Sequence, residues 1–179
     1  KSVTKLYERI ANKTGYRFWG NVEFGKHIDL GDLRAHYNCI VFAYGAKGSR
    51  RLGIPGENLQ GSHAATDFVA WYNGHPDYSS CTFDLAVDTA VVVGIGNVAV
   101  DGARDLCLTE EELLQSDIAD YALDALLKSN VKEVVLLGRR GPAQAAFTNP
   151  EAKELGNLQG ADIHVAAEEA ELDTLSSQE

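Results

Sequence analysis

The chain of 179 residues contains no methionine, only three cysteines and four prolines, and no long apolar run. A membrane-spanning helix needs roughly 18 consecutive apolar residues, and no run here approaches that length. We therefore expect no transmembrane segment. The first residues, Lys1-Ser2-Val3, include neither an initiator methionine nor a signal peptide. We expect a partial chain, from which targeting signals are missing.

Cysteine and positive charge are also scarce. Cys39, Cys81 and Cys107 are too far apart for a C-x-x-C redox pair or a metal site, so we expect buried free thiols and no metal. This excludes a dithiol-type disulfide reductase unless its cysteines lie outside this chain. With 16 basic and 26 acidic residues, the net charge is −10. Nucleic acid is excluded as a main partner, because phosphate binding requires a basic face.

The most informative motif is residues 89–99, TAVVVGIGNVA, an apolar β-branched run that ends in G-x-G-x-x-A. Gly94 permits a tight turn after the strand, and Gly96 lets the backbone approach a pyrophosphate. Ala99 lets the following helix pack close to the strand. Asn97 and Val98 supply backbone N–H groups at the helix N-terminus, where the helix dipole favours an anion. The pattern predicts a dinucleotide site.

A second apolar run, residues 133–137, leads to Arg139 and Arg140. In most such units the next strand ends about 20 residues after the glycines, with an acidic residue that binds a ribose hydroxyl. Here the residues are basic and lie further along the chain. Two guanidinium groups bind a 2′-phosphate that a carboxylate would repel. The pair therefore favours NADP(H) over NAD(H), although it could also be a solvated pair that balances the acidic surface.

The remaining pattern completes an α/β fold. We expect a parallel central sheet and a loop or domain crossover at residues 46–61. Ser62 and Asp117 are expected to cap helices, and Thr109 with Glu112 is expected to form a capping box. The expected strands are residues 17–24, 39–44, 89–93, 133–137 and, weakly, 162–165, and the expected helices are 30–37, 64–72, 97–107, a short helix after Thr109, and one from 117 to about 130.

Several segments resemble one family in order and spacing. FWGNVEFG, YGAKGSRRLGIPGENLQG, DFVAWYNGHPD, GIGNVAVDGARDL, SDIADYALDAL and VVLLGRRGPAQAAFT are similar to segments of the adrenodoxin reductase and ferredoxin–NADP⁺ reductase family of flavoenzymes. The resemblance covers nearly the whole chain and weakens after about Leu158. It implies two nucleotide-binding domains, of which residues 1–47 would be part of the FAD-binding domain. Residues 48–179 would be a Rossmann-like NADP-binding domain, incomplete at its C-terminus.

The resemblance also implies a function. The parent protein would pass electrons from NADPH through FAD to a ferredoxin- or adrenodoxin-type iron–sulfur protein. We expect a monomer, mitochondrial on the matrix side if eukaryotic and otherwise cytoplasmic. A relative of the glutamate synthase small subunit, or an NADP(H)-binding fragment without catalysis, remains an alternative. This fragment alone is expected to be inactive, because the family's N-terminal FAD-binding glycine motif and C-terminal flavin segment are absent from its sequence.

Site residues follow from the same resemblance, position by position. The proposed NADP contacts are Arg50, Gly94, Ile95, Gly96, Asn97, Val98, Arg139, Arg140 and Glu151; the positions beside the flavin are Val22, Gly45 and Ala46. Glu154 matches a glutamate near the nicotinamide and is the candidate catalytic residue.

Alternatives and departures accompany these assignments. Arg50 could belong to a solvated basic loop, and the two glutamates could face solvent on a helix. Trp19, Trp71 and Tyr72 are interpreted as packing residues rather than flavin stackers. Two departures from the family weaken the expected affinity: Ile95 stands where an amide is usual, and Gly102 lies inside a helix.

Overall fold

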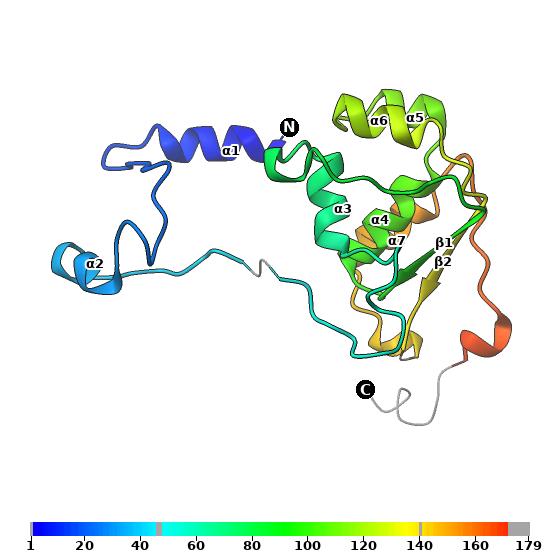
Figure 1. The fold of residues 1–179 in the computed structure, drawn as a ribbon. Coiled ribbons are helices and arrows are strands. Elements are labelled where there is room, and N and C mark those ends of the chain that lie inside the picture. Colours follow the sequence, from blue (N-terminus) through cyan, green and yellow to red (C-terminus); the bar gives the residue numbers. More distant parts are fainter. Residues whose placement is uncertain (1, 46–47, 140, 172–179) are drawn as a thin grey trace. The chain divides into compact units, whose positions relative to one another are not determined.

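A computed structural model describes residues 2–45, 48–139 and 141–171 (Figure 1). The chain divides into two compact units, Lys1–Gly45 and Ala46–Glu179. The assignment of residues 1–47 to an FAD domain and of residues 48–179 to an NADP domain stays a prediction. Ala46 and Arg140 lie outside the described residues. No helix in the described ranges is long and apolar enough to cross a membrane.

The first unit contains two helices, α1 (Ser2–Ala11) and α2 (Leu30–His36). The predicted helix at 30–37 is confirmed, and it begins at a capping box formed by Asp29 and Asp32. The predicted strands at 17–24 and 39–44 are wrong, since residues 2–45 form no strand beyond an isolated bridge between Phe24 and Ile28. A strand needs a neighbouring strand for its hydrogen bonds, and none lies beside these segments in the described chain.

Two expectations of burial in this unit are also wrong. Trp19 is 68% exposed, so it is not a packing residue in this structure. Cys39 is exposed, whereas Cys81 and Cys107 of the second unit are partly buried; all three thiols are free. Both corrections have one cause: this unit's apolar runs are not covered by other described residues.

The second unit is built on two parallel strands, β1 (Thr89–Val93) and β2 (Glu133–Leu137), in the register Thr89↔Glu133 to Val93↔Leu137. Both strands were predicted with these bounds, and β-branched residues favour them. The crossover between them carries α4 (Asn97–Cys107), which packs on both strands (Figure 1). This is the βαβ arrangement expected of a partial Rossmann-like domain.

The second unit contains four further helices among the described residues. They are α3 (Ala65–Tyr72), α5 (Glu110–Leu114), α6 (Asp120–Leu126) and α7 (Asn149–Leu155), with 3₁₀ turns η1 (Pro76–Tyr78), η2 (Pro142–Gln144) and η3 (Ala167–Glu169). The capping box of Thr109 and Glu112 is confirmed.

Three expectations for this unit are wrong. Neither Ser62 nor Asp117 caps a helix, because α3 begins after Ala64 and α6 after Ala119. Both helices therefore start later along the chain than their predicted caps require. Residues 162–165 form no strand, since no strand of the described chain pairs with them.

The core of the second unit lies between α3 and α6. Trp71, Tyr72 and Ala122 are buried together, and Phe68 and Phe83 pack their rings against Trp71 at centroid distances of 5.7 and 4.9 Å. Trp71 and Tyr72 are therefore packing residues, as predicted. On α4, Val100 and Ala103 are almost fully buried. This packing fixes the orientation of α4, whose N-terminus faces the glycine turn.

Candidate functional site

The glycine turn connects the end of β1 to the start of α4. Gly94 has φ +133°, a conformation that side-chain-bearing residues rarely adopt. Its N–H donates to the Leu137 carbonyl at 3.0 Å, which extends the pairing of the two strands into the turn. An atom added at the Cβ position of Gly94 would lie 3.7 Å from the Ala99 side chain, in ordinary contact. The backbone conformation, rather than lack of space, is what requires glycine here.

Open space surrounds the N-terminus of α4. A Cβ placed on Gly96, the N-cap residue, would meet nothing within 4 Å, and no side chain caps the helix. The Gly96 carbonyl accepts the Val100 N–H at 3.0 Å, so the N–H groups of Asn97 and Val98 precede the first intrahelical bond. The first turn carries no acidic residue. These features suit a bound anion such as a pyrophosphate.

The chain returns to the glycine turn after β2. Arg139 is exposed two residues beyond the strand, while its predicted companion Arg140 lies outside the described residues. Ala146 then forms a parallel bridge with Gly96, and its N–H donates to the Ile95 carbonyl at 2.9 Å. The structure thus brings the segment that carries Arg139 back against the predicted turn, a relationship that the sequence pattern did not predict.

Two side chains of the turn complete this junction. The Asn97 Oδ1 atom accepts the Thr148 N–H at 2.9 Å. Ile95 lies over Gly138, where an added Cβ would be 3.0 Å from the Ile95 Cγ2 atom. Ile95 therefore packs against the start of the arginine segment. Where the family usually has an amide, this chain has an apolar side chain in contact with Gly138.

The two candidate glutamates lie on α7, which packs against α4. Glu151 is partly buried, and its Oε2 atom has no hydrogen-bond partner among the described residues. Glu154 is more exposed and lies 3.7 Å from the Arg104 Nε atom of α4. Neither glutamate is wholly solvated, which is compatible with a role in binding. The nicotinamide role of Glu154 stays a prediction.

A buried hydrogen bond between α3 and α4 was not indicated by the sequence. Asp105 of α4 is 5% exposed, accepts a hydrogen bond from the Tyr72 hydroxyl of α3, and pairs with Arg104 at 3.0 Å. Burial raises the pKa of Asp105, and the Arg104 guanidinium partly opposes that rise. Burial, followed by the Asp105 charge, also raises the pKa of Tyr72. Because its partner is distant in sequence, no local pattern marks this pair.

The remaining predicted residues are not joined to the turn. Arg50 is exposed in a segment without helix or strand, and no hydrogen bond or ion pair between described residues links it to the glycine turn. Val22 and Gly45 belong to the first unit and are exposed, and Gly45 has φ +66°. Their assignment to the nucleotide and the flavin stays a prediction.

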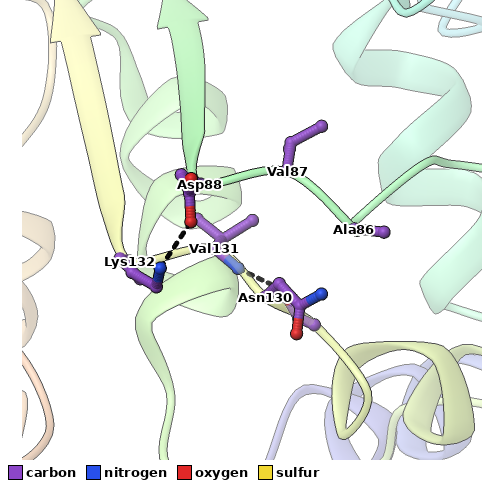
Figure 2. Close-up of a pocket in the computed structure, with 7 residues that line it drawn as sticks. Ala86, Val87, Asp88, Asn130, Val131 and Lys132 are labelled. Atoms are coloured by element: carbon purple, nitrogen blue, oxygen red, sulfur yellow. Dashed lines mark hydrogen bonds and ion pairs between the residues drawn. The ribbon is translucent and has the colours of Figure 1, made fainter.

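Figure 2 shows a pocket at the opposite end of the two strands. It is lined by residues that precede them, where the Lys132 Nζ atom donates to Asp88 Oδ1 at 2.6 Å. Gly94 follows the other end of β1. Since ligands of parallel α/β sheets bind beyond the carboxyl ends of the strands, this pocket is separate from the candidate site. No group of three or more potential metal ligands occurs among the described residues.

Comparison with known proteins supplies close relatives, although no family model matches. The chain is 46% identical over 179 residues to NADPH-ferredoxin reductase FprA of Mycobacterium tuberculosis H37Rv, covering 100% of this chain and 39% of that protein. It is 44% identical over 180 residues to the mitochondrial NADPH:adrenodoxin oxidoreductase of Arabidopsis thaliana, covering 100% of this chain and 37% of that protein. The chain therefore spans about two fifths of the length of these relatives.

Comparison with solved structures also finds FprA. The structure of Mycobacterium tuberculosis FprA in complex with NADPH superposes with a TM-score of 0.82 at 48% identity, over 89% of this chain and 35% of that one. The mixed α/β fold with its parallel strand pair is thus shared with part of a protein that was solved with NADPH.

Proposed function

As a partial chain, this protein belongs to the adrenodoxin reductase and NADPH-ferredoxin reductase family, and from that premise we propose its activity. The complete protein transfers electrons from NADPH, through bound FAD, to a ferredoxin- or adrenodoxin-type iron–sulfur protein. The chain covers only about two fifths of its relatives, so this proposal concerns the whole protein.

One observation carries the nucleotide part of the proposal: the segment that bears Arg139 is hydrogen-bonded back onto the glycine turn. The pyrophosphate would lie against the open N-terminus of α4 at Gly96 and Asn97. Arg139 and Arg140 would bind the 2′-phosphate, as a charge-assisted contact that NAD(H) cannot make. Arg50 and Glu151 are further proposed contacts.

The flavin part rests on the family. FAD, when bound, supplies the step between a two-electron donor and a one-electron acceptor. Val22 and Gly45 are exposed and available to lie beside it, with Ala46 following in sequence. Glu154, which lies on α7, would be near the nicotinamide.

Compartment and assembly are proposed from the same relatives. The Arabidopsis relative is named as mitochondrial, whereas FprA is a bacterial protein. The protein is proposed to act on the matrix side of mitochondria in a eukaryote, or in the cytoplasm of a bacterium, and to act as a monomer. The acidic composition implies that docking on an acidic iron–sulfur protein uses basic residues outside this chain or near Arg50.

Calorimetric titration of the full-length protein with NADP⁺ and NAD⁺ tests the proposal. NADP⁺ should bind more tightly, and the variant R139A/R140A should lose about 2–4 kcal/mol of NADP⁺ binding if both charge-assisted contacts disappear. Lys153→Ala, which removes an exposed positive charge from α7, should leave the preference unchanged. Equal affinity of the folded protein for both nucleotides would overturn the assignment. NADPH-dependent ferredoxin reduction tests the electron-transfer part separately.

A further inference from the structure

The segment that carries the arginines is attached to the glycine turn at both of its ends. At its start, the Leu137 carbonyl accepts the Gly94 N–H at 3.0 Å, and Gly138 lies under the Ile95 side chain. At its far end, the attachments are two hydrogen bonds of 2.9 Å each, from Ala146 N–H to the Ile95 carbonyl and from Thr148 N–H to Asn97 Oδ1.

These attachments differ in kind. Two of them join backbone groups, which most substitutions preserve, and a third is the apolar contact of the Ile95 side chain with Gly138. The bond to Thr148 depends on one side-chain atom, the Asn97 Oδ1, and therefore on the identity of residue 97. Asn97 is also the first residue of α4, directly beside the open helix N-terminus. One amide thus links the position suited to a pyrophosphate with the segment that contains Arg139.

The bond also changes what Asn97 can do for a ligand. An amide oxygen accepts hydrogen bonds and the amide nitrogen only donates them. With Oδ1 directed at Thr148, the side chain offers the ligand its nitrogen, while its oxygen serves the protein. Its larger contribution is then to restrict the arginine segment before the nucleotide arrives. Pre-organisation of this kind increases affinity because less conformational freedom is lost on binding.

We infer that Asn97 is a positioning residue for recognition of a 2′-phosphate, acting through its hydrogen bond to Thr148 on the arginine segment. The inference rests on the proposed NADP(H) function and adds a determinant outside the arginine pair. It applies to ligands of one chemical class, adenosine nucleotides phosphorylated at the 2′ position. Nucleotides without that phosphate bind at the glycine turn alone and gain nothing from the attachment.

The test compares adenosine 2′,5′-bisphosphate with AMP, which differ only in the 2′-phosphate, by titration of the full-length flavin-containing protein. Asn97→Ala should lower the ratio of their affinities about tenfold, the effect of one hydrogen bond of roughly 1.4 kcal/mol, whatever it does to the affinity for AMP itself. Asn97→Asp keeps an oxygen acceptor for Thr148. It should weaken both ligands through charge repulsion while leaving their ratio within about threefold of the wild type.

A second measurement separates positioning from general structural damage. Arg139→Ala is made in the wild-type and Asn97→Ala backgrounds. If Asn97 acts through the arginine segment, the loss caused by Arg139→Ala should be smaller in the second background. Additive losses, or an unchanged ligand ratio in folded Asn97→Ala, would overturn the inference. Should Asn97→Ala fail to fold, Asn97→Ser, which shortens the reach of the side-chain oxygen, replaces it with the same expected losses.

The failure of the proposed function has a different signature. If the wild-type protein binds adenosine 2′,5′-bisphosphate no better than AMP, the 2′-phosphate site itself is refuted. If the wild type discriminates strongly and Arg139→Ala reduces that discrimination, but Asn97→Ala does not, only the role of Asn97 fails.

Discussion

Arg104 of α4 forms an ion pair with Glu154 of α7, with 3.7 Å between the guanidinium Nε and the carboxylate Oε2. The same guanidinium lies 3.0 Å from Asp105. The two carboxylates differ in environment, since the Asp105 side chain is 6% exposed and that of Glu154 is 58% exposed. Arg104 therefore contributes mainly by neutralising a buried charge, and secondarily by linking the two helices.

This difference predicts unequal effects on stability. Arg104→Gln should destabilise the protein by about 3 kcal/mol, because it leaves the buried Asp105 carboxylate without its counter-charge. Glu154→Gln should cost less than about 1 kcal/mol, because an exposed pair is screened by solvent. Urea unfolding of both variants measures the contrast. Equal losses would mean that the pairing with Asp105 contributes nothing.

The raised pKa of Asp105 predicts a pH dependence. Its ordinary value is 3.8, and burial raises it in the folded protein. The folded state then binds the proton more tightly, so the contribution of this group to stability is fully present below about pH 4 and is lost as pH rises through the raised pKa. Asp105→Asn removes the pH dependence of stability that this carboxyl causes, and its amide oxygen can still accept a hydrogen bond from the Tyr72 hydroxyl.

Unfolding free energies of the wild type and of Asp105→Asn, measured between about pH 4 and about pH 7, check the sign. The stability of the wild type relative to the variant should decrease with increasing pH. A difference that is constant or increases over this range would contradict the assigned shift.

Two glycines of the same βα unit should respond oppositely to alanine. At Gly102, inside α4, an added Cβ meets nothing within 4 Å, so Gly102→Ala should stabilise the protein by about 1 kcal/mol through helix propensity. At Gly94, with φ +133°, the same change strains the backbone and should destabilise by at least about 1 kcal/mol. Thermal unfolding of both variants distinguishes them. A destabilised Gly102→Ala would show that α4 is more closely packed than the structure indicates.

The sequence predicted those parts of the fold that local patterns determine. Residues 89–93 and 133–137 are β-branched runs, and the glycines with Ala99 mark the turn into α4; all were found within the predicted bounds. The runs at 17–24 and 39–44 have similar composition but form no strand. A strand depends on its neighbour as much as on its own residues, and the composition of one segment does not identify that neighbour.

The candidate site was predictable only in part, for a related reason. Gly94, Gly96 and Arg139 were marked by residue type and spacing. The attachment of Thr148 to Asn97 uses a backbone N–H, which every residue except proline carries, so no sequence pattern distinguishes it. The Tyr72–Asp105 hydrogen bond likewise joins residues on two different helices. Contacts of this kind depend on tertiary packing and become visible only in the fold.

Helix caps show how the predicted and observed boundaries can be tested. Thr109 was predicted to cap α5 and does so: its Oγ1 accepts the Glu112 N–H at 3.3 Å, and the Glu112 carboxylate accepts the Thr109 N–H at 2.9 Å. That backbone hydrogen bond, with the Thr109 hydroxyl, lowers the pKa of Glu112. Ser62 was predicted to cap α3 but lies outside that helix, which has Ala64 at its N-cap.

Thr109→Ala should therefore cost about 1 kcal/mol of stability, whereas Thr109→Ser, which keeps the hydroxyl, should cost clearly less. Ser62→Ala, the matched change at the position that does not cap, should stay within about 0.5 kcal/mol of the wild type. Urea unfolding compares the three variants, and NMR titration should show the Glu112 pKa moving upward in Thr109→Ala, because the hydroxyl that helps to lower it is gone. If Ser62→Ala were as destabilising as Thr109→Ala, Ser62 would cap α3 as the sequence predicted, and the helix would begin before Ala65.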